Sequence, residues 1–470
     1  MSDIKFGTDG WRAIIADEFT VENVARITLA TGLWVKKNFE DNLSVVIGHD
    51  CRFAGSLFME TATKVLASQG IKVHQANSVV TTPMISLATK ELKASIGIVL
   101  TASHNPPLYN GFKLKGHYGG PLTSDKIIEV EMLIPSKSNV NLKEVNLSVM
   151  EESGLLEYVD LESMYIDKIK SSFDLDAIKN SGLRFAYDAM YGAGQFVMRK
   201  LFPEMSFLHC DYNPSFNGQA PEPIAKNLNP FSQLIKNAGN IAAGLATDGD
   251  ADRIGLFDEK GEFVDSHHIL LLLLLYLHKY KSMNGKVVMA ASTTPRVIKL
   301  AEMWKLEHDT VQVGFKHIAQ QMINEDVLIG GEESGGIAIK GHIPERDGIW
   351  MGLVIFEYMA KSGKSLTSLI NEVYELVGEF KYWRDDLHIN EDLKRSIVER
   401  CQNNAFQSFG KYNVQRIDTT DGYKFILSDD EWLMIRPSGT EPVLRCYAEG
   451  KTLDNAKDIL ASCKQTIGVS

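Results

Sequence analysis

Short apolar segments alternate with longer amphipathic segments along most of the chain. In the amphipathic segments apolar residues recur every three or four positions, which is the period of one helix face. The alternation predicts parallel β-strands joined by helices, as in layered α/β proteins. Expected strands cover residues 44–48, 71–74, 96–100, 183–187, 241–246, 286–290 and 327–329, and an expected helix covers residues 57–66.

The same strand-and-helix theme starts three times, which predicts three related α/β domains with mixed or parallel sheets. Residues 151–165 are polar with a helical pattern and would link the first domain to the second. The turn at residues 258–261 would mark the next boundary. Helical spacing of apolar residues from Leu366 to Leu376 predicts a helix that closes the third domain before Gly378.

The segment after Gly378 changes character. Residues 424–427 and 432–435 are strand-like, and residues 453–463 have a helical pattern. This combination predicts a smaller, separate α+β domain. The expected domains are residues 1–155, 156–256, 257–377 and 378–470.

Composition and charge narrow the possible partners. The 470 residues include 44% hydrophobic residues, enough for sizeable cores, and the formal net charge is −11. Nucleic-acid and anionic-membrane partners favour broad basic surfaces, so we expect neither. An anionic substrate would have to be held by local basic residues in an acidic protein.

Cysteine usage and the apolar runs indicate a cytoplasmic protein. The N-terminus reaches the polar segment 6–12 too early for a signal segment, and the longest apolar run, residues 269–277, is short of the ~20 residues that span a bilayer. That run is expected to be the buried side of a helix. The cysteines are odd in number and lack metal-ligand spacing, which is typical of reduced thiols. They are Cys51, Cys210, Cys401, Cys446 and Cys463.

Ser103 is a candidate nucleophile because it lies where the apolar strand 96–100 gives way to a loop, Thr-Ala-Ser-His-Asn-Pro-Pro. A serine before an Asn-Pro turn is often only a turn former. A second loop strengthens the functional interpretation, because Asp248, Asp250 and Asp252 alternate along it. A hydroxyl nucleophile together with a hard, oxygen-liganded metal suggests phosphoryl transfer.

The three aspartates resemble the start of a calcium-binding EF-hand loop, and Glu259 even falls at its twelfth position. Arg253, however, stands where that loop needs a glycine, and the flanks have strand and hairpin patterns instead of helices. Three crowded carboxylates are costly without a cation, and alternate positions of an extended chain point the same way. We therefore expect a Mg²⁺ site, since Mg²⁺ combines few carboxylates with phosphate oxygens and water.

Two further loops carry polar groups after apolar strands. Glu332, Glu333 and Ser334 lie among glycines and suit sugar hydroxyls, although exposed glycine-rich turns are common. The second loop, residues 436–442 with Arg445 beyond it, would cradle a phosphate, although it could be an ordinary Pro-Ser-Gly turn. Ligands of open α/β sheets bind beyond the carboxyl ends of the strands, so all four loops could form one site. Nearby cations that could complete it are Arg12, Lys113 and Lys316.

At these four loops the chain resembles the α-phosphohexomutase superfamily, the phosphoglucomutase and phosphomannomutase enzymes, in the same order and over essentially its whole length. Residues 101–106 resemble the phosphoserine loop and residues 248–253 the metal loop. Residues 331–335 resemble the sugar loop and residues 436–442 the phosphate loop. The resemblance implies three α/β domains and a smaller TATA-binding-protein-like α+β domain around a central cleft.

The resemblance also implies a mechanism. Ser103 would donate a phosphoryl group to a hexose phosphate and take the other phosphate back from the bisphosphorylated sugar, with glucose 1,6-bisphosphate as activator. Ser103, Asp248, Asp250 and Asp252 would hold Mg²⁺, and Ser103, His104, Lys113, Arg12 and Arg346 would be catalytic. The substrate would be bound by Arg253, Gly314, Lys316, Glu332, Ser334, His342, Arg436, Ser438, Gly439, Thr440 and Arg445.

Two positions depart from the family patterns. Phosphomannomutase-type members carry a histidine where this chain has Gly336, and phosphoglucomutase-type members carry a lysine where it has Arg346. Arginine is a poor proton acceptor, so His104, His342 or Lys113 remain candidates for the general base. The hypothesis is a cytoplasmic phosphoglucomutase, with mannose phosphates as second candidate substrates. The alternatives are a phosphoglucosamine mutase, a metal-dependent sugar-phosphate phosphatase and a non-enzymatic sugar-phosphate binder.

Overall fold

The structure is a computed structural model that describes residues 4–437 and 443–469. The chain forms two compact units. Unit 1 comprises Met1–Gly285 and Gly314–Leu369, and unit 2 comprises Lys286–Val313 and Ile370–Ser470. Among the described residues, no helix combines the length and the apolar character needed to cross a membrane.

The first part of unit 1 is a seven-stranded mixed sheet of described residues, in the order β1-β5-β4-β2-β3-β7 with β6 beside β5. The strands are β1 (Trp11–Ile14), β2 (Ser44–His49), β3 (Lys72–Ala76), β4 (Ile96–Leu100), β5 (Tyr109–Gly116), β6 (Gly120–Pro121) and β7 (Leu156–Val159). The helices are α1 (Val21–Asn38), α2 (Gly55–Ser68), α3 (Thr82–Glu91), α4 (Ser124–Glu131) and α5 (Leu147–Glu152).

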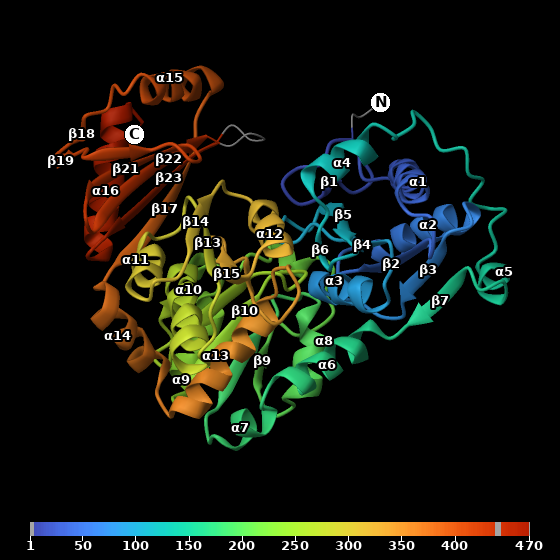
Figure 1. Cartoon of the computed structure of the whole chain (residues 1–470), viewed down its shortest axis with the longest axis horizontal. Coiled ribbons are helices and arrows are strands. Elements are labelled where there is room, and N and C mark those ends of the chain that lie inside the picture. Colours follow the sequence, from blue (N-terminus) through green and yellow to red (C-terminus); the bar gives the residue numbers. More distant parts are fainter. Residues whose placement is uncertain (1–3, 438–442, 470) are drawn as a thin grey trace. The chain divides into compact units, whose positions relative to one another are not determined.

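The central strands of this sheet are buried on both faces. Every residue of β2 and β4 is buried, as expected for parallel strands that are covered by helices. Figure 1 shows α1 and α2 on one face of the sheet and α3 on the other. Alternate residues such as Val45 and Ile47 join the core with Phe58 and Leu66 of α2. The sheet thus presents the carboxyl end of β4, where Ser103 follows, as a fixed edge.

The second part of unit 1 is a five-stranded sheet of described residues, in the order β12-β11-β10-β8-β9. Its elements are α6 (Leu161–Ser172), α7 (Leu175–Asn180), β8 (Phe185–Asp188), α8 (Gly194–Leu201), β9 (Ser206–Leu208), the 3-10 turns Phe216–Gly218 and Ala225–Asn227, α9 (Asn229–Ala238), β10 (Ala243–Thr247), β11 (Ile254–Phe257) and β12 (Phe263–Val264). Antiparallel pairing of β10 with β11 confirms the strand and hairpin flanks expected for the aspartate loop.

The last part of unit 1 supplies helices that pack on these sheets. It contains α10 (Ser266–Leu275) followed by a π-helical turn (Tyr276–Tyr280), then α12 (Phe315–Asn324), β15 (Val327–Gly331), β16 (Ile337–Ile339) and α13 (Gly348–Ser362). The apolar run in α10 is buried on all sides, because Ile269 to Leu275 have no exposed surface. The helix was predicted to bury one side, whereas the structure buries all of its sides. Helix α13 lies against β10 and β11, and Asp347 caps its N-terminus.

Unit 2 contains a five-stranded antiparallel sheet of described residues, in the order β17-β23-β22-β21-β20. Its elements are β13 (Lys286–Ala290), α11 (Arg296–Met303), β14 (His308–Val311), β17 (Lys381–His388), α15 (Glu391–Gln402), β18 (Ser408–Phe409), β19 (Tyr412–Asn413), β20 (Arg416–Asp418), β21 (Tyr423–Ser428), β22 (Glu431–Pro437), β23 (Val443–Gly450) and α16 (Leu453–Ile467). Helix α14 (Leu366–Val377) spans the division between the units and ends before Gly378, as predicted.

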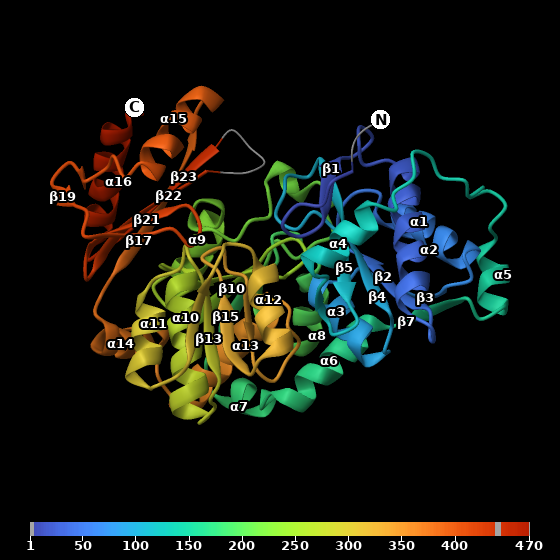
Figure 2. The ribbon, with the colours of Figure 1, turned by 45° about the horizontal axis from the view of Figure 1, so that its top comes forward.

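The sheet of unit 2 is covered on both faces, and alternate side chains of β22 pack on opposite faces. Leu433 and Ile435 join a core with α15 and α16, which lie together beside the sheet in Figure 2. Trp432 and Met434 point the other way, into a cluster with Ala291 from the end of β13. This is the predicted α+β arrangement.

Two local predictions were wrong. The segment 151–165 is not a continuous helical pattern, because it contains strand β7, which pairs in parallel with β3 of the first sheet. Arg436 is not in a loop beyond its strand, because β22 continues to Pro437. The turn at residues 258–261 joins β11 to β12 within the second sheet.

Candidate active site

Ser103 lies at the carboxyl end of β4 and is fully buried. Its backbone has a φ of 51°, in the left-handed region that few residues other than glycine adopt. The Ser103 N–H donates to Thr101 Oγ1 at 2.9 Å, and Ser103 Oγ donates to Asp248 Oδ2 at 2.7 Å. The candidate nucleophile is therefore aimed directly at the aspartate loop.

The two loops also approach through their backbones. A Cβ atom on Gly249 would lie 2.7 Å from the carbonyl oxygen of Ser103, which is closer than real Cβ contacts. Glycine is therefore required at this position for the loops to meet. The Asp-Gly-Asp sequence thus serves close packing of the two loops as well as charge.

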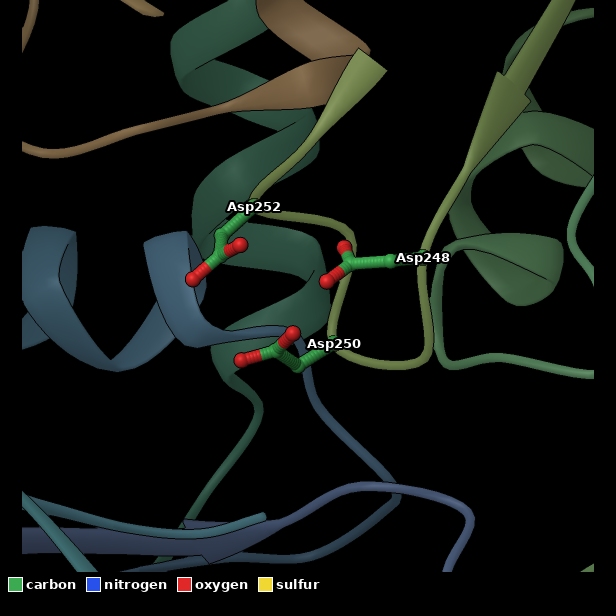
Figure 3. A group of neighbouring side chains, drawn as sticks. All are labelled: Asp248, Asp250 and Asp252. Atoms are coloured by element: carbon green, nitrogen blue, oxygen red, sulfur yellow. The ribbon is translucent and has the colours of Figure 1, made fainter. Parts of the chain in front are cut away.

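Asp248, Asp250 and Asp252 are buried in the turn between β10 and β11, and Figure 3 shows their carboxylates converging on one space. One oxygen of each lies within 4.8 Å of the others. The convergence was predicted, but the reason given was wrong. The loop is not extended, because Ala251 has a φ of 57° and its N–H closes a turn onto the Asp248 carbonyl.

The aspartate cluster fits a small divalent cation. Asp250 Oδ1 and Asp252 Oδ1 are buried and have no hydrogen-bond partner among the described residues. Their Oδ2 atoms are held from the other side, by Thr82 at 2.5 Å and Lys113 at 2.8 Å for Asp250, and by Arg346 at 2.7 Å for Asp252. Buried carboxylate oxygens without partners are costly, and an oxygen-seeking ion such as Mg²⁺ would satisfy them.

Burial and mutual repulsion act strongly on these carboxyls. Burial raises the pKa of Asp248 well above its usual range, and the Asp250 and Asp252 carboxylates raise it further. Burial would also raise the pKa of Asp250, but Lys113, Thr82 and Arg346 together outweigh it, and the pKa is lowered overall. The cluster therefore holds one carboxyl that resists ionisation without a cation and one that is firmly ionised.

Two buried cations balance this negative charge. Lys113 Nζ lies 2.8 Å from Asp9, 2.8 Å from Asp250 and 3.1 Å from Asp252, and Arg346 pairs with Asp9 and Asp252. Burial opposes charge on both cations, but the aspartates outweigh it and hold the pKa of Lys113 and of Arg346 above their usual ranges. Both side chains stay protonated, which suits electrostatic roles and not the role of proton acceptor.

Asp9 belongs to the site but was missed from the sequence. Burial would raise the pKa of Asp9, but Lys113 and other cations outweigh it, and that pKa is well below its usual range. Asp9 thus bridges Lys113 and Arg346, two of the predicted catalytic residues. The available signal was its position in the Gly-Thr-Asp-Gly turn three residues before Arg12.

His104 and Arg12 also lie beside the nucleophile. His104 Nδ1 is 3.4 Å from Ser103 Oγ, and Arg12 donates to Asn105 Oδ1 at 2.7 Å. Burial, followed by the nearby cations Arg253 and Arg12, holds the pKa of His104 well below its usual range. The imidazole is therefore neutral at physiological pH and has a lone pair that can accept a proton.

The predicted sugar loop is fastened to the aspartate loop. Arg253 and Gly336 form an antiparallel backbone bridge, and Ile254 N–H donates to the Gly335 carbonyl at 3.2 Å. Glu332 is buried at 5% exposure, and its Oε1 accepts from Gly314 N–H at 2.8 Å. Burial, opposed by Arg346, raises the pKa of Glu332 to about 6. The structure thus brings Gly314, Glu332 and Arg253 to the same region as the aspartates.

Gly336 leaves space for Arg346. A Cβ atom on Gly336 would lie 2.5 Å from Arg346 Cδ. The two departures from the family patterns are therefore linked, because a side chain at position 336 would displace the arginine that pairs with Asp9 and Asp252.

His342 has a different environment from the other candidates. Its Nε2 lies 2.9 Å from Asp347, the N-cap residue of α13, and its ring stacks on Trp350 at 3.6 Å between centroids. Burial, opposed by Asp347, lowers the pKa of His342. Lys316 lies in the first turn of α12, and Ser334 lies half-buried in the turn after Glu332.

The remaining predicted residues belong to unit 2. Arg436 and Arg445 are direct partners across β22 and β23, and Arg436 Nε lies 3.1 Å from Asp421. Like charges directly opposite each other repel, so this pair of guanidinium groups suits an anion. Ser438, Gly439 and Thr440 lie outside the described residues.

Four profiles of one protein family match the chain in sequence order. They are described as phosphoglucomutase/phosphomannomutase alpha/beta/alpha domains I, II and III and C-terminal domain. The matched residues are 3–141, 163–261, 265–377 and 393–464, respectively. This order confirms the predicted fold class of three α/β domains and a different fourth domain.

Similar proteins of known name match almost the full length. A phosphoglucomutase/phosphomannomutase of Thermococcus kodakarensis is 32% identical over 97% of this chain and 96% of its own. A phosphoglucosamine/phosphogalactosamine mutase of Sulfurisphaera tokodaii is 28% identical over 98% of each chain. A solved structure from Thermus thermophilus, provisionally described as a phosphomannomutase, is 31% identical with a TM-score of 0.85 and covers 99% of both chains.

Proposed function

Because this chain belongs to the phosphoglucomutase/phosphomannomutase family, we propose that it interconverts hexose 1-phosphate and hexose 6-phosphate with glucose as the preferred sugar. Membership makes the protein a phosphohexomutase, an enzyme that moves a phosphoryl group within a sugar phosphate. The choice of sugar, the phosphoserine and the residue roles are the proposed parts.

One contact carries the proposal: Ser103 Oγ lies 2.7 Å from a carboxylate of the buried aspartate cluster. A hydroxyl whose only function was to form a turn would not need this partner from another sheet. We propose that Ser103 carries a phosphoryl group in the resting enzyme. The bond between Ser103 Oγ and phosphorus breaks, a bond from phosphorus to the free sugar hydroxyl forms, and that hydroxyl loses its proton.

In the second half of the cycle, the bond between phosphorus and the sugar oxygen breaks at the other end of the sugar, and a bond between phosphorus and Ser103 Oγ forms. The bisphosphorylated sugar turns around, and its original phosphate returns to Ser103 Oγ. Lys113, Arg346 and Arg12 supply fixed positive charge near the transferring group. The ion pairs of Lys113 and Arg346, and the hydrogen bond from Arg12 to Asn105, keep that charge in place before the reaction starts. A trace of glucose 1,6-bisphosphate would restore any Ser103 that has lost its phosphoryl group.

Asp248, Asp250 and Asp252 are proposed to hold Mg²⁺, because their carboxylates converge and the unpartnered Oδ1 atoms of Asp250 and Asp252 fit a small divalent ion. When bound, the ion supplies positive charge that stabilises the phosphoryl group during transfer. The carboxylates are positioned by Thr82, Lys113 and Arg346, so that the protein itself fixes the geometry of the cluster.

His104 is proposed as the proton acceptor for the sugar hydroxyl. Among His104, Lys113 and His342, it alone is both uncharged at physiological pH and in contact distance of Ser103 Oγ, at 3.4 Å. Lys113 is held protonated by three aspartates, and His342 is engaged with Asp347 and Trp350. Geometry and protonation state therefore favour the same residue.

Glucose is preferred to mannose or glucosamine on the basis of the Glu332-Glu333-Ser334 segment and the run from His342 to Gly348. A phosphoglucosamine mutase is the alternative, supported by a full-length relative with that kind of name. Arg436 and Arg445 in unit 2 are proposed to bind a substrate phosphate. We further propose a cytoplasmic location, with no nucleic acid or membrane as partner.

An isomerisation assay tests the proposal. Purified protein receives glucose 1-phosphate, Mg²⁺ and a trace of glucose 1,6-bisphosphate, while glucose 6-phosphate and free phosphate are both measured. We expect glucose 6-phosphate without stoichiometric phosphate release. Release of phosphate without isomerisation would identify a phosphatase, and faster turnover of glucosamine 1-phosphate or mannose 1-phosphate in parallel reactions would replace glucose as the substrate.

A further inference from the structure

One buried arginine holds the nucleophile loop by its backbone. Arg52 follows β2 and has no exposed surface. Its Nη2 donates to the carbonyl oxygens of Ser103 and Asn105, each at 2.6 Å. Its Nη1 donates to those of Pro106 and Tyr109, each at 2.9 Å. A single guanidinium group therefore satisfies three carbonyls of a loop that lacks a regular ladder of its own, and that of Tyr109 at the start of β5.

Arg52 is itself fixed on three sides. Asp50 Oδ1 accepts the Arg52 backbone N–H at 2.9 Å, and Asp50 Oδ2 lies 3.3 Å from Arg52 Nε. The ring of Phe216, from the second part of unit 1, lies 5.0 Å from the guanidinium carbon, as in a cation–π contact. The guanidinium plane is thus oriented before any substrate arrives.

The same carboxylate also reaches Ser103 by a second route. Asp50 Oδ2 accepts from Thr101 Oγ1 at 2.6 Å, and Thr101 Oγ1 accepts the Ser103 N–H at 2.9 Å. Ser103 is therefore hydrogen-bonded at its N–H by Thr101 and at its carbonyl by Arg52. These two hydrogen bonds lie on either side of the Ser103 Cα atom and fix the dihedral angles between them.

The two backbone hydrogen bonds of Ser103 explain how a serine stays in the left-handed conformation. A φ of 51° is uncommon for a residue with a Cβ atom and persists only where the surroundings determine it. In this conformation Ser103 Oγ points at Asp248, at 2.7 Å. A relaxed backbone would turn the Oγ atom away from the aspartate cluster.

We infer that Arg52 is a positioning residue for phosphoryl transfer, which holds Ser103 Oγ in line with the aspartate cluster by bonding the backbone of its loop. The inference rests on the proposed function of Ser103. Lysine could not replace Arg52, because an ammonium group lacks the planar fork that reaches four separated carbonyls. The role differs from support of the fold in general, since all four hydrogen bonds of the guanidinium group go to the nucleophile loop or to the first residue of the strand that follows it.

The test compares Arg52→Lys with Arg26→Lys. Arg26 is a matched control because it is also buried, at 7% exposure, and donates to a backbone carbonyl, that of Pro135 at 2.7 Å, but has no contact with the nucleophile loop. The readouts are kcat, KM for glucose 1-phosphate, melting temperature, and the rate at which glucose 1,6-bisphosphate phosphorylates Ser103, followed by intact mass.

Arg52→Lys is expected to lower kcat and the rate of Ser103 phosphorylation together, by about 10- to 100-fold, because a displacement of about 1 Å at a reacting atom has effects of this size. KM should stay within about twofold. Arg26→Lys should leave both rates within about twofold at a similar loss of melting temperature. Equal losses of kcat in the two variants, or a kcat within about twofold of the unmodified protein in Arg52→Lys, would overturn the inference.

A second variant covers the case in which Arg52→Lys does not fold. Asp50→Asn keeps Arg52 and its four carbonyls but removes the charge that orients the guanidinium. It should lower kcat about tenfold with KM unchanged, and a kcat equal to that of the unmodified protein would contradict the inference. Failure of the proposed function would be seen separately, since the unmodified protein would then neither isomerise glucose 1-phosphate nor become phosphorylated on Ser103.

Discussion

Glu332 shows how burial of a single residue sets a functional pH range. Its pKa is raised to about 6 by burial, so the carboxylate that would accept sugar hydroxyl groups forms only above that pH. The free energy of unfolding changes with pH in the opposite direction to sugar binding. A carboxyl whose pKa is higher in the folded state stabilises the fold below about pH 4.5, and this contribution, about 2 kcal/mol, is lost as the pH rises through 6.

The KM for glucose 1-phosphate should therefore rise as the pH falls below about 6, by more than titration of the substrate phosphate alone would cause. Glu332→Gln cannot ionise, so its KM should follow only the substrate. Steady-state kinetics from pH 5 to 8 on both proteins checks this, because the ratio of the two KM values isolates Glu332. A ratio that does not change with pH would show that Glu332 does not bind the sugar as a carboxylate.

At the residue scale, functional residues that belong to a recognisable sequence motif were predictable. Residues whose role depends on tertiary contacts were not. Ser103 and the three aspartates follow apolar strands and carry unusual polar patterns, and the structure brings them together. Asp9 and Arg52 were missed because their roles depend on contacts with residues that are far away in the sequence. Asp9 meets Lys113 and Arg346 only through long-range folding, which a single sequence does not show.

At the scale of elements, continuous apolar strands were predicted well and edge strands were not. The predicted strands 96–100 and 286–290 coincide with β4 and β13, because strands buried on both faces are apolar throughout. Strand β7 was missed because Glu157 and Tyr158 are exposed, which gives it the polar composition of a linker. Arg436 was placed beyond β22 because a charged residue was assumed to end the strand.

The sugar loop and the segment before α13 should behave as one element through Gly336 and Arg346. Gly336→Ala places a Cβ atom 2.5 Å from Arg346 Cδ, so the arginine must move away from Asp9 and Asp252. We expect about a tenfold or greater loss of kcat and a loss of about 1–3 kcal/mol in the free energy of unfolding, as for other overpacked sites. Kinetics and urea denaturation measure the two effects.

A double-mutant cycle supplies the control for this prediction. If Gly336→Ala acts by displacing Arg346, it should have little further effect on kcat in an Arg346→Ala background. Additive losses would instead mean that position 336 acts independently of the arginine.

At the scale of the whole molecule, the chain divides into two compact units, and the aspartate cluster belongs to unit 1. A ligand stabilises only the cooperative unit to which it binds. At about 100 times its dissociation constant, Mg²⁺ should slow hydrogen exchange through opening of unit 1 by about 100-fold, equivalent to ~2.7 kcal/mol. The antiparallel sheet of unit 2 should exchange at an unchanged rate.

Hydrogen–deuterium exchange followed by mass spectrometry, with and without Mg²⁺, checks this prediction. Asp250→Asn should remove most of the protection and weaken the Mg²⁺ dependence of turnover, because it replaces a carboxylate whose Oδ1 has no partner among the described residues. Equal protection of both units, or protection that survives in Asp250→Asn, would argue against the aspartate cluster as the metal site.

Transfer of a phosphoryl group between Ser103 and the sugar is the central step of the proposed mechanism, and label transfer tests it most directly. The protein is phosphorylated with ³²P-labelled glucose 1,6-bisphosphate, freed of ligand, and mixed with unlabelled glucose 1-phosphate and Mg²⁺ in a single turnover. The label should leave Ser103, appear first in glucose 1,6-bisphosphate and then in glucose 6-phosphate, and Ser103→Ala should fold normally but take up no label. Label that appears only as inorganic phosphate, or equal labelling of Ser103→Ala, would contradict the account.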